Sequence, residues 1–249
     1  VNSEGLKNKS LKFDLGIYGH SYARLDTLRN IENSTNLSFS SWIKSSSLEE
    51  QVIAQLGRNE TDALSEFMVY TKEDYSDDAF GFNHVEYTGA LVCTGEWVHI
   101  AYVKEGSIGR LYINSELVKT ANSINNIDVQ YSFNDFVLGR DYRDGSNNFI
   151  GLMDELTLWK KALSPLEVKS LSNRFINPEE EDLVFYFNSD EGIGDYVYDS
   201  SKSENDIFNK NDLKLEGALF SSDVPTEDQV SFRTLTNANG FYLLEGIRY

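Results

Sequence analysis

Hydrophobic and polar residues alternate along most of this chain, and a period of two residues is typical of half-buried β-strands. In residues 37–44, for example, Leu37, Phe39 and Ile43 share one face, while Trp42 lies on the other. Further strands are predicted at residues 11–16, 18–25, 51–57, 66–71, 97–103, 110–114, 136–139 and 183–187.

Many short strands separated by turns, with a single helix, favour an all-β fold in the form of a two-sheet antiparallel β-sandwich. The helix is predicted near residues 164–174, because Ser164 and Glu167 match a capping box and Pro165 occupies the first helical position. The segment 71–83 is acidic and aromatic, and we expect it to be a loop.

The predicted strand with the sequence FIGLMDELTLW contains one acid within an apolar alternation. Asp154 has the same parity as the apolar residues, so its side chain is expected to point into the core with them. A buried carboxylate is costly unless it is paired or binds a metal ion. The apolar positions of this alternation are Ile150, Leu152, Leu156 and Leu158.

The C-terminal part of the chain predicts a second unit. Residues 223–228 form a polar linker, and residues 229–249 read as two strands around a turn, which is too little chain to hold a core. We therefore expect a sandwich over residues 1–222, with 183–220 completing it after the helix, and a linker and first hairpin of a following small β-module over 223–249. The alternatives are that 183 begins a second copy of the sandwich, or that the hairpin docks on the first.

Composition narrows the functional classes. The chain has 249 residues, 40% of them hydrophobic, and a net charge of -18, which argues against a nucleic-acid partner. The charge suits solubility, cation binding and neutral ligands. No run of about 18 apolar residues is present, so no membrane span is expected. The chain begins with Val1 rather than Met, and we expect it to be a piece of a longer protein.

The reactive side chains are few. Cys93 is the single cysteine, so no internal disulfide is possible, and we expect it to be buried. His20, His84 and His99 are scattered and match no zinc spacing. His99 shares a strand face with apolar residues and is expected to be a core or inter-strand histidine.

Several motifs resemble laminin-G-like domains, which are concanavalin-A-like jelly rolls. Residues 95–114 match the pattern G-x-W-x-H-x-A-Y followed by L-Y-I-N, and residues 236–247 resemble small prealbumin-like or carboxypeptidase-regulatory-like modules. The Asp-Glu-Gly-x-Gly run after residue 187 resembles the segment that usually opens a laminin-G-like domain. The closing strand and helix start of the family correspond here to Gly151, Asp154, Glu155, Ala162, Leu163 and Ser164.

This resemblance implies a calcium ion at the rim of the sandwich, as in laminin-G-like and pentraxin-like relatives. Asp14, Asp154 and Glu155 are the candidate metal ligands, since oxygen ligands from several loops suit a hard cation. The alternative is that Asp154 pairs with Arg140 or caps a turn.

The loop 141–148 is the candidate ligand-binding site. Carboxylates and amides can bond sugar hydroxyls, and a tyrosine ring can stack on a sugar ring. A solvated hairpin loop is the alternative. The candidate residues are Asp141, Tyr142, Arg143, Asn147 and Asn148.

Three functions remain open. The first is a non-catalytic extracellular module that binds carbohydrate or glycoconjugate, with structural calcium; its partners would be a glycan or an extracellular protein and the neighbouring modules of a secreted or cell-surface chain. The second is a spacer or adhesion module. The third, a glycoside hydrolase or lyase, is disfavoured because neither Gly-x-Ser-x-Gly nor a Glu-x-Asp-x-x-Glu strand occurs.

Overall fold

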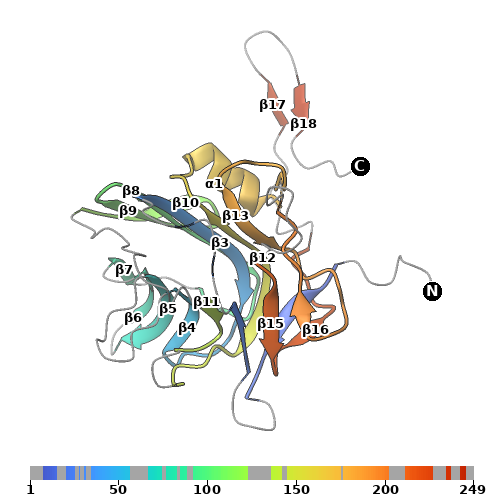
Figure 1. Ribbon diagram of the computed structural model, residues 1–249. Coiled ribbons are helices and arrows are strands. Elements are labelled where there is room, and N and C mark those ends of the chain that lie inside the picture. Colours follow the sequence, from blue (N-terminus) through green and yellow to red (C-terminus); the bar gives the residue numbers. More distant parts are fainter. Residues whose placement is uncertain are drawn as a thin grey trace.

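The structure is a computed structural model that describes most of the chain. The described residues are 8–15, 21–25, 28, 31, 35–56, 67–74, 77–82, 85–88, 92–122, 136–141, 145–174, 176–201, 211–226, 234–236 and 242–244, and the side chains of 56, 67–70, 72–74, 77–82, 85–88, 234–236 and 242–244 are not considered. Two antiparallel sheets face one another with a single helix on one side (Figure 1). The predicted all-β sandwich is therefore confirmed.

Sheet A has the strand order β10-β9-β8-β3-β12-β1-β16, and β13 also pairs with β12. Its strands are β1 (Ser10–Phe13), β3 (Asn36–Lys44), β8 (Val98–Glu105), β9 (Ile108–Ile113), β10 (Glu116–Ala121), β12 (Gly151–Trp159), β13 (Leu183–Phe187) and β16 (Leu219–Ser221).

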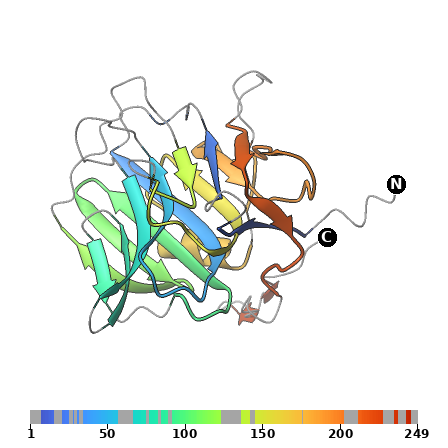
Figure 2. The same cartoon turned by 90° about the horizontal axis from the view of Figure 1, so that it is seen from below.

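Sheet B has the order β14-β15-β2-β11-β4-β5-β6-β7. From below, it lies in front of sheet A (Figure 2). Its strands are β2 (Tyr22–Leu25), β4 (Gln51–Leu56), β5 (Phe67–Asp74), β6 (Asp77–Phe82), β7 (Val85–Thr88), β11 (Phe136–Leu138), β14 (Tyr196–Val197) and β15 (Leu213–Glu216).

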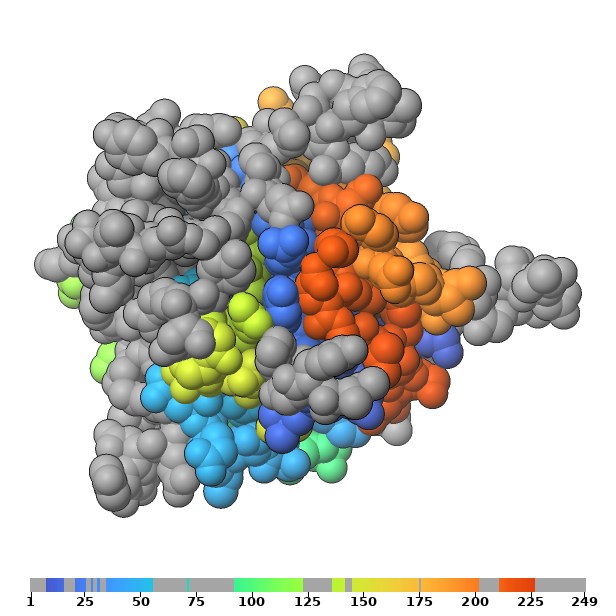
Figure 3. Space-filling view, turned by 60° about the horizontal axis from the view of Figure 1, so that its bottom comes forward, coloured from blue at the N-terminus to red at the C-terminus, as the bar shows by residue number. Residues whose placement is uncertain are grey.

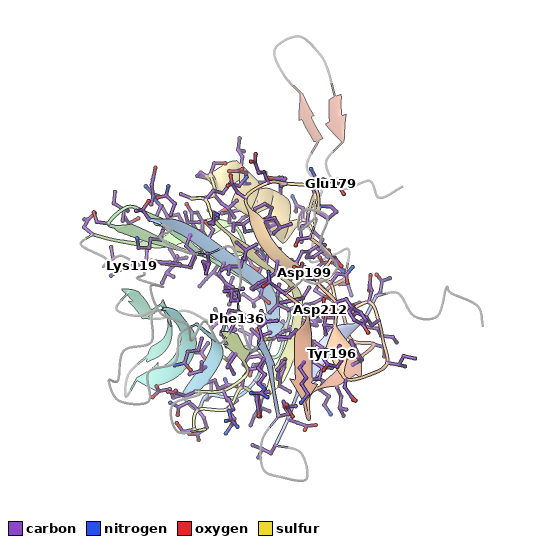
Figure 4. The ribbon with its side chains drawn as sticks, in the orientation of Figure 1. Lys119, Phe136, Glu179, Tyr196, Asp199 and Asp212 are labelled. Carbon is purple, nitrogen blue, oxygen red and sulfur yellow. The ribbon has the colours of Figure 1, made fainter. Side chains whose placement is uncertain are left out.

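The main core fills the space between the sheets, because the apolar faces of the alternating strands meet there. Phe185 stacks on Phe187 at 4.6 Å between ring centroids and packs on Phe136 at 5.0 Å. Phe136 lies between the two sheets (Figure 4). The segment after the helix contributes to this core from both layers, since β13 and β16 pair in sheet A and β14 and β15 pair in sheet B.

A second, smaller core lies on the outer face of sheet A beneath the helix α1 (Pro165–Ser172). The predicted capping box is present: Glu167 N donates to Ser164 Oγ, and Ser164 N donates to the Glu167 carboxylate. The helix buries Val168 and Leu171 against Trp159, which is 2% exposed. Cap and apolar stripe together fix where the helix starts and which side faces the sheet.

The side chain of Asp154 was predicted to point into the core, and this was wrong because β12 contains a β-bulge. The register against β3 shifts between Asp154 and Thr157, and Glu155 has a φ of +52°. An extra residue reverses the parity of everything that follows it. Met153 and Leu156 both face the inter-sheet core, whereas Asp154 points out of the sandwich, beside Trp42 on β3.

Two local predictions were wrong, one on the segment 71–83 and one on Cys93. Of the predicted loop 71–83, residues 71–74 belong to β5 and residues 77–82 form β6, because β5, β6 and β7 pair in succession, and no composition rule reveals that pairing. Cys93 is partly exposed rather than buried, with its Sγ 3.8 Å from Gln51 Nε2. The strand β10 was not predicted, because its exposed edge position gives it no apolar alternation.

The linker after β16 lies against sheet A, and we call its residues 222–226 the strap. Trp97 Nε1 donates to one carboxylate oxygen of Asp223 at 2.9 Å, and Lys44 Nζ bonds the other at 2.8 Å. Ser10 Oγ donates to the Asp223 carbonyl at 2.6 Å. Beyond the strap, β17 (Thr234–Thr236) and β18 (Tyr242–Leu244) pair with each other as the predicted hairpin.

Candidate functional site

Two of the three acids predicted as metal ligands, Asp154 and Glu155, lie at the point on β12 where the neighbouring strand changes from β1 to β13, which we call the fork. One edge of β12 pairs with β1 as far as Met153 and with β13 from Leu156 onward. Asp154 and Glu155 lie between these two pairings, and Arg174, just after α1, reaches over the fork. We call these two acids, Arg174 and Tyr186 of β13 the fork cluster.

Short contacts hold the fork cluster together. Arg174 Nε and Nη2 bond Glu155 Oε1 at 2.8 Å and 2.7 Å, and Nη2 lies 3.5 Å from Asp154 Oδ2. Tyr186 donates its hydroxyl to the other Glu155 oxygen. Arg174 Nη1 also donates to the carbonyl of Pro225 in the strap at 3.2 Å. The cluster therefore ties the bulge, the helix end and the strap to one guanidinium.

Burial dominates the electrostatics of the fork cluster. Asp154 is 0% exposed and Glu155 4% exposed. Burial, and then the neighbouring Glu155 carboxylate, raise the pKa of Asp154 well above its usual value, while Arg174 opposes this shift. Burial also raises the pKa of Tyr186, which stays a hydrogen-bond donor.

These residues do not fit a calcium shell. Arg174 already supplies the positive charge beside Asp154 and Glu155, so this guanidinium, rather than Arg140, is the partner of Asp154. Asp14 lies four positions along β1 from the residue opposite Asp154, or about 13 Å at the usual rise of a strand. Among the described residues, no group of three or more His, Cys, Asp or Glu side chains is arranged to hold a metal ion.

Asp14 itself lies at the sandwich surface beyond β1. Its carboxylate is 3.1 Å from Lys12 Nζ, and its backbone N–H and carbonyl both bond Ser21 Oγ at 2.8 Å. Asp14 therefore fixes the chain after β1, and calcium binding by this chain stays a prediction.

Several polar groups of the predicted ligand loop form hydrogen bonds within the loop. Asp141 is 1% exposed, and its main chain bonds Ser146 and Gly145. Asn147 Nδ2 lies 3.4 Å from Glu50 Oε1, and Asn148 Nδ2 donates to the Gly145 carbonyl at 3.3 Å. Tyr142 and Arg143 lie outside the described residues, as do His20 and His84.

Two tyrosines outside the predicted strands form an exposed aromatic surface on the outer face of sheet B. Tyr196 is 45% and Tyr198 55% exposed, whereas Val197 between them is 0% exposed and faces the core. Alternation therefore puts both tyrosine rings outward. The alternating run at residues 195–199 could have revealed this, because tyrosines take its polar positions.

Charged side chains border these tyrosines. Tyr196 pairs in register with Lys214, and Lys214 with Arg24, so that the three lie side by side across β14, β15 and β2. Glu216 Oε1 lies 2.6 Å from Lys214 Nζ and 3.6 Å from Arg24 Nε, and the bond from Lys214 contributes most to lowering the pKa of Glu216. We call these five residues the tyrosine platform; β15 lies beside β2 on the face shown in Figure 3.

A comparison with known families now identifies the superfamily. A laminin-G-type family model, described as the concanavalin A-like lectin/glucanases superfamily, matches residues 18–169. The chain belongs to this superfamily. The laminin-G-like resemblance of the sequence motifs is thereby confirmed. No curated protein sequence matches the chain.

Solved structures show the same concanavalin A-like fold at low identity. A Bacteroides ovatus protein, described provisionally as carbohydrate-binding, has a TM-score of 0.64 and 16% identity over 86% of this chain. The chain spans 60% of that structure's length. A heptameric SAP-like pentraxin from Limulus polyphemus has a TM-score of 0.54 and 14% identity, covering 67% of this chain and 82% of the pentraxin.

A third solved structure shares the fold over part of its length. The enzymatically active domain of tailspike protein 2 from bacteriophage CBA120 has a TM-score of 0.51 and 13% identity, covering 78% of this chain and 31% of the tailspike. Because the match covers less than a third of the tailspike chain, it shows a shared fold and no shared activity, and the chemistry of this chain must be argued from its side chains. None of the helices in the described part of this chain has the length and apolarity to cross a membrane.

Proposed function

We propose that this chain is a non-catalytic extracellular module that binds carbohydrate or glycoconjugate, and that the tyrosine platform is its contact surface. The observation that carries the proposal is the outward pair of Tyr196 and Tyr198 beside Lys214 and Glu216. Exposed aromatic residues next to fixed polar groups are typical of ligand-binding surfaces.

The chemistry of the platform suits a sugar. A tyrosine ring offers an apolar face to the C–H side of a pyranose and a hydroxyl that can donate or accept. Lys214 and Arg24 can donate to sugar hydroxyls, and Glu216 can accept from them. Arg24 and Lys214 lie beside Glu216, and the Glu191 carboxylate accepts from Tyr198 N at 2.8 Å, so the tyrosines are bordered by charges of both signs.

The fork cluster supports a non-catalytic role. Glycoside hydrolysis needs two carboxyl groups that flank the scissile bond within reach of the substrate. Asp154 and Glu155 are instead adjacent in sequence and buried at 0% and 4% exposure, with Arg174 bound to both. They hold the strand fork together and leave no room for a glycosidic oxygen.

The predicted loop adjoins the platform. Arg140, at its start, stacks on the ring of Tyr22 at 4.0 Å, and Tyr22 pairs in register with Glu216. Contacts from residues 141–148 to the same ligand, a structural calcium ion and a secreted or cell-surface location stay proposals. The carbohydrate binding attributed to the Bacteroides ovatus protein is consistent with the platform function.

A glycan array tests the proposal, with and without added calcium and chelator. We expect binding by the natural chain and its loss in the double variant Tyr196→Ala, Tyr198→Ala. Leu117→Ala is the matched control, because Leu117 is a similarly exposed residue, at 53%, on β10 of the other sheet. Absence of binding under all conditions would favour the spacer function, and release of oligosaccharide products would contradict the non-catalytic assignment.

A further inference from the structure

A pocket of about 330 Å³ lies beside α1, next to the second core on the outer face of sheet A. Its volume is at the low end of ligand pockets, which suits a single sugar-sized group rather than an extended chain. The lining residues are Trp159, Leu163, Glu167, Ser170, Leu171, Ile176, Asn177 and Glu180. We call it the α1 pocket; Glu179, labelled in Figure 4, marks the chain just before Glu180.

The floor of the α1 pocket is apolar. Leu163, Leu171 and Ile176 supply aliphatic surface. Trp159 is 2% exposed, and its indole N–H has no hydrogen-bond partner in the described part of the chain. The indole nitrogen has no surface open to the pocket, so Trp159 contributes ring surface rather than a hydrogen-bond donor.

The rim has a surplus of acceptors. Lys161 Nζ bonds Glu167 Oε1 and Glu180 Oε2 at 2.8 Å each and lies 5.0 Å from the centre of the Trp159 ring. Two carboxylates against one ammonium leave one negative charge, so an anionic ligand is disfavoured and an N–H donor is favoured. Asn177 accepts from the backbone of Glu179 through Oδ1, which leaves its amide NH₂ as a donor.

One common chemical group meets all of these demands. An acetamido group carries a methyl for the aliphatic floor, a carbonyl oxygen for the Asn177 amide donor and an N–H for the carboxylate rim. A hydroxyl supplies no methyl, and a free amine supplies neither a methyl nor an acceptor. We propose that the α1 pocket is a second ligand site that binds an N-acetylated amino sugar.

This site is independent of the tyrosine platform, because its residues come from the end of β12, from α1 and from the turn before β13. Ligand-observed NMR titration of the full chain tests it with N-acetylglucosamine, N-acetylgalactosamine, glucose and glucosamine. We expect the two N-acetylated sugars to bind at least about tenfold more tightly than glucose and glucosamine, since the acetamido group adds several contacts.

Variants then locate the site. Asn177→Asp keeps the Oδ1 acceptor but removes the amide donor, and Glu180→Gln removes the surplus charge; each is expected to weaken N-acetylglucosamine binding about fivefold to tenfold. Glu181→Gln is the matched control, because Glu181 is exposed and does not line the pocket. Circular dichroism melts confirm that each variant is folded.

The outcomes separate this site from the platform. Unchanged N-acetylglucosamine binding in the double variant Tyr196→Ala, Tyr198→Ala supports the α1 pocket even if the platform binds no glycan. Binding that is lost in that double variant but retained in Asn177→Asp and Glu180→Gln would overturn the proposal. Equal affinity for all four sugars, or no binding of any at tens of millimolar, would also overturn it.

Discussion

The outer faces of the two sheets differ in what covers them. On sheet A, α1 covers the second core, the strap contacts Arg174 of the fork cluster, and Asp154 and Glu155 are almost fully buried. On sheet B, the tyrosine platform keeps its rings exposed. The charged groups of the fork cluster find partners within the chain, whereas the tyrosine rings of the platform are open to solvent. Buried charge therefore indicates structural support here, and the exposed tyrosines are the basis for the proposed contact surface.

The largest contrast is expected from aromatic deletions on the two faces. Trp159→Ala should lower the free energy of unfolding by about 3–5 kcal/mol, because the indole fills the second core. Tyr196→Ala should change it by less than about 0.5 kcal/mol, because half of that side chain is exposed. Urea melts measure both values. A loss below about 1 kcal/mol for Trp159→Ala would contradict its core role.

Ion pairs should show the same difference. Arg174→Ala should cost about 3 kcal/mol, because it leaves Glu155 buried without a cation. Arg110→Ala, which breaks an exposed pair with Glu105 at 2.9 Å, should cost between about 0 and 1 kcal/mol. If urea melts give equal losses, the fork cluster does not hold the face closed.

Acid should weaken the covered face through His99. This side chain is 1% exposed, its ring packs 5.5 Å from that of Trp42, and burial lowers the pKa of His99 to about 3. The unfolded chain therefore binds a proton from about pH 6.5 downward while the folded chain does not, so stability is lost as pH falls from 6.5 to 3. Between pH 7 and 5 this costs about 2 kcal/mol.

The His99 contribution can be isolated by comparison with His99→Gln. The raised pKa of Asp154 acts in the opposite sense, since the folded state then holds the proton more tightly, and this term is present in both proteins. We expect the pH dependence of the unfolding free energy to differ between them by about 2 kcal/mol from pH 7 to 5. Parallel curves would show that His99 is protonated in the folded state.

The strap should contribute less than the cluster beneath it. Asp223→Ala removes the bonds to Trp97 and Lys44 and should cost about 1 kcal/mol, because the Asp223 side chain is only partly covered. Glu116→Ala, an exposed acid on β10, serves as the control and should have no measurable effect. A neutral result for Asp223→Ala in thermal melts would mean that the Asp223 side chain does not hold the strap, which leaves the bonds from Ser10 and Arg174 to the strap backbone.

The smallest difference is expected from chelation, when the Tm of the natural chain is compared with that of Asp154→Asn. If calcium stabilises this chain, it binds away from Asp154, so a chelator should shift the Tm of the natural chain and of Asp154→Asn equally. Asn keeps the oxygen that accepts from Glu155 N. A chelator effect on the natural chain that disappears in Asp154→Asn would restore Asp154 as a calcium ligand.

The sequence by itself determined the elements that depend on short-range pattern. Alternation in residues 37–44 gave β3 nearly to its ends, and the capping box at Ser164 placed α1, because both signals come from neighbouring residues. The motif order also identified the superfamily. The two tyrosines of the platform are visible as an alternating pair, although their exposure is not.

Only the tertiary structure decided which way the acids point and what lies beside them. The bulge at Glu155 reverses which residues of β12 face the core, so Asp154 faces outward. The composition of the strand does not reveal this bulge. Its partner Arg174 lies 20 residues later and reaches it only because α1 folds back over the sheet. The platform likewise brings Arg24 beside Lys214 and Tyr196 through the pairing of β2, β15 and β14, which are far apart in the sequence. Which distant strands pair is decided by the fold.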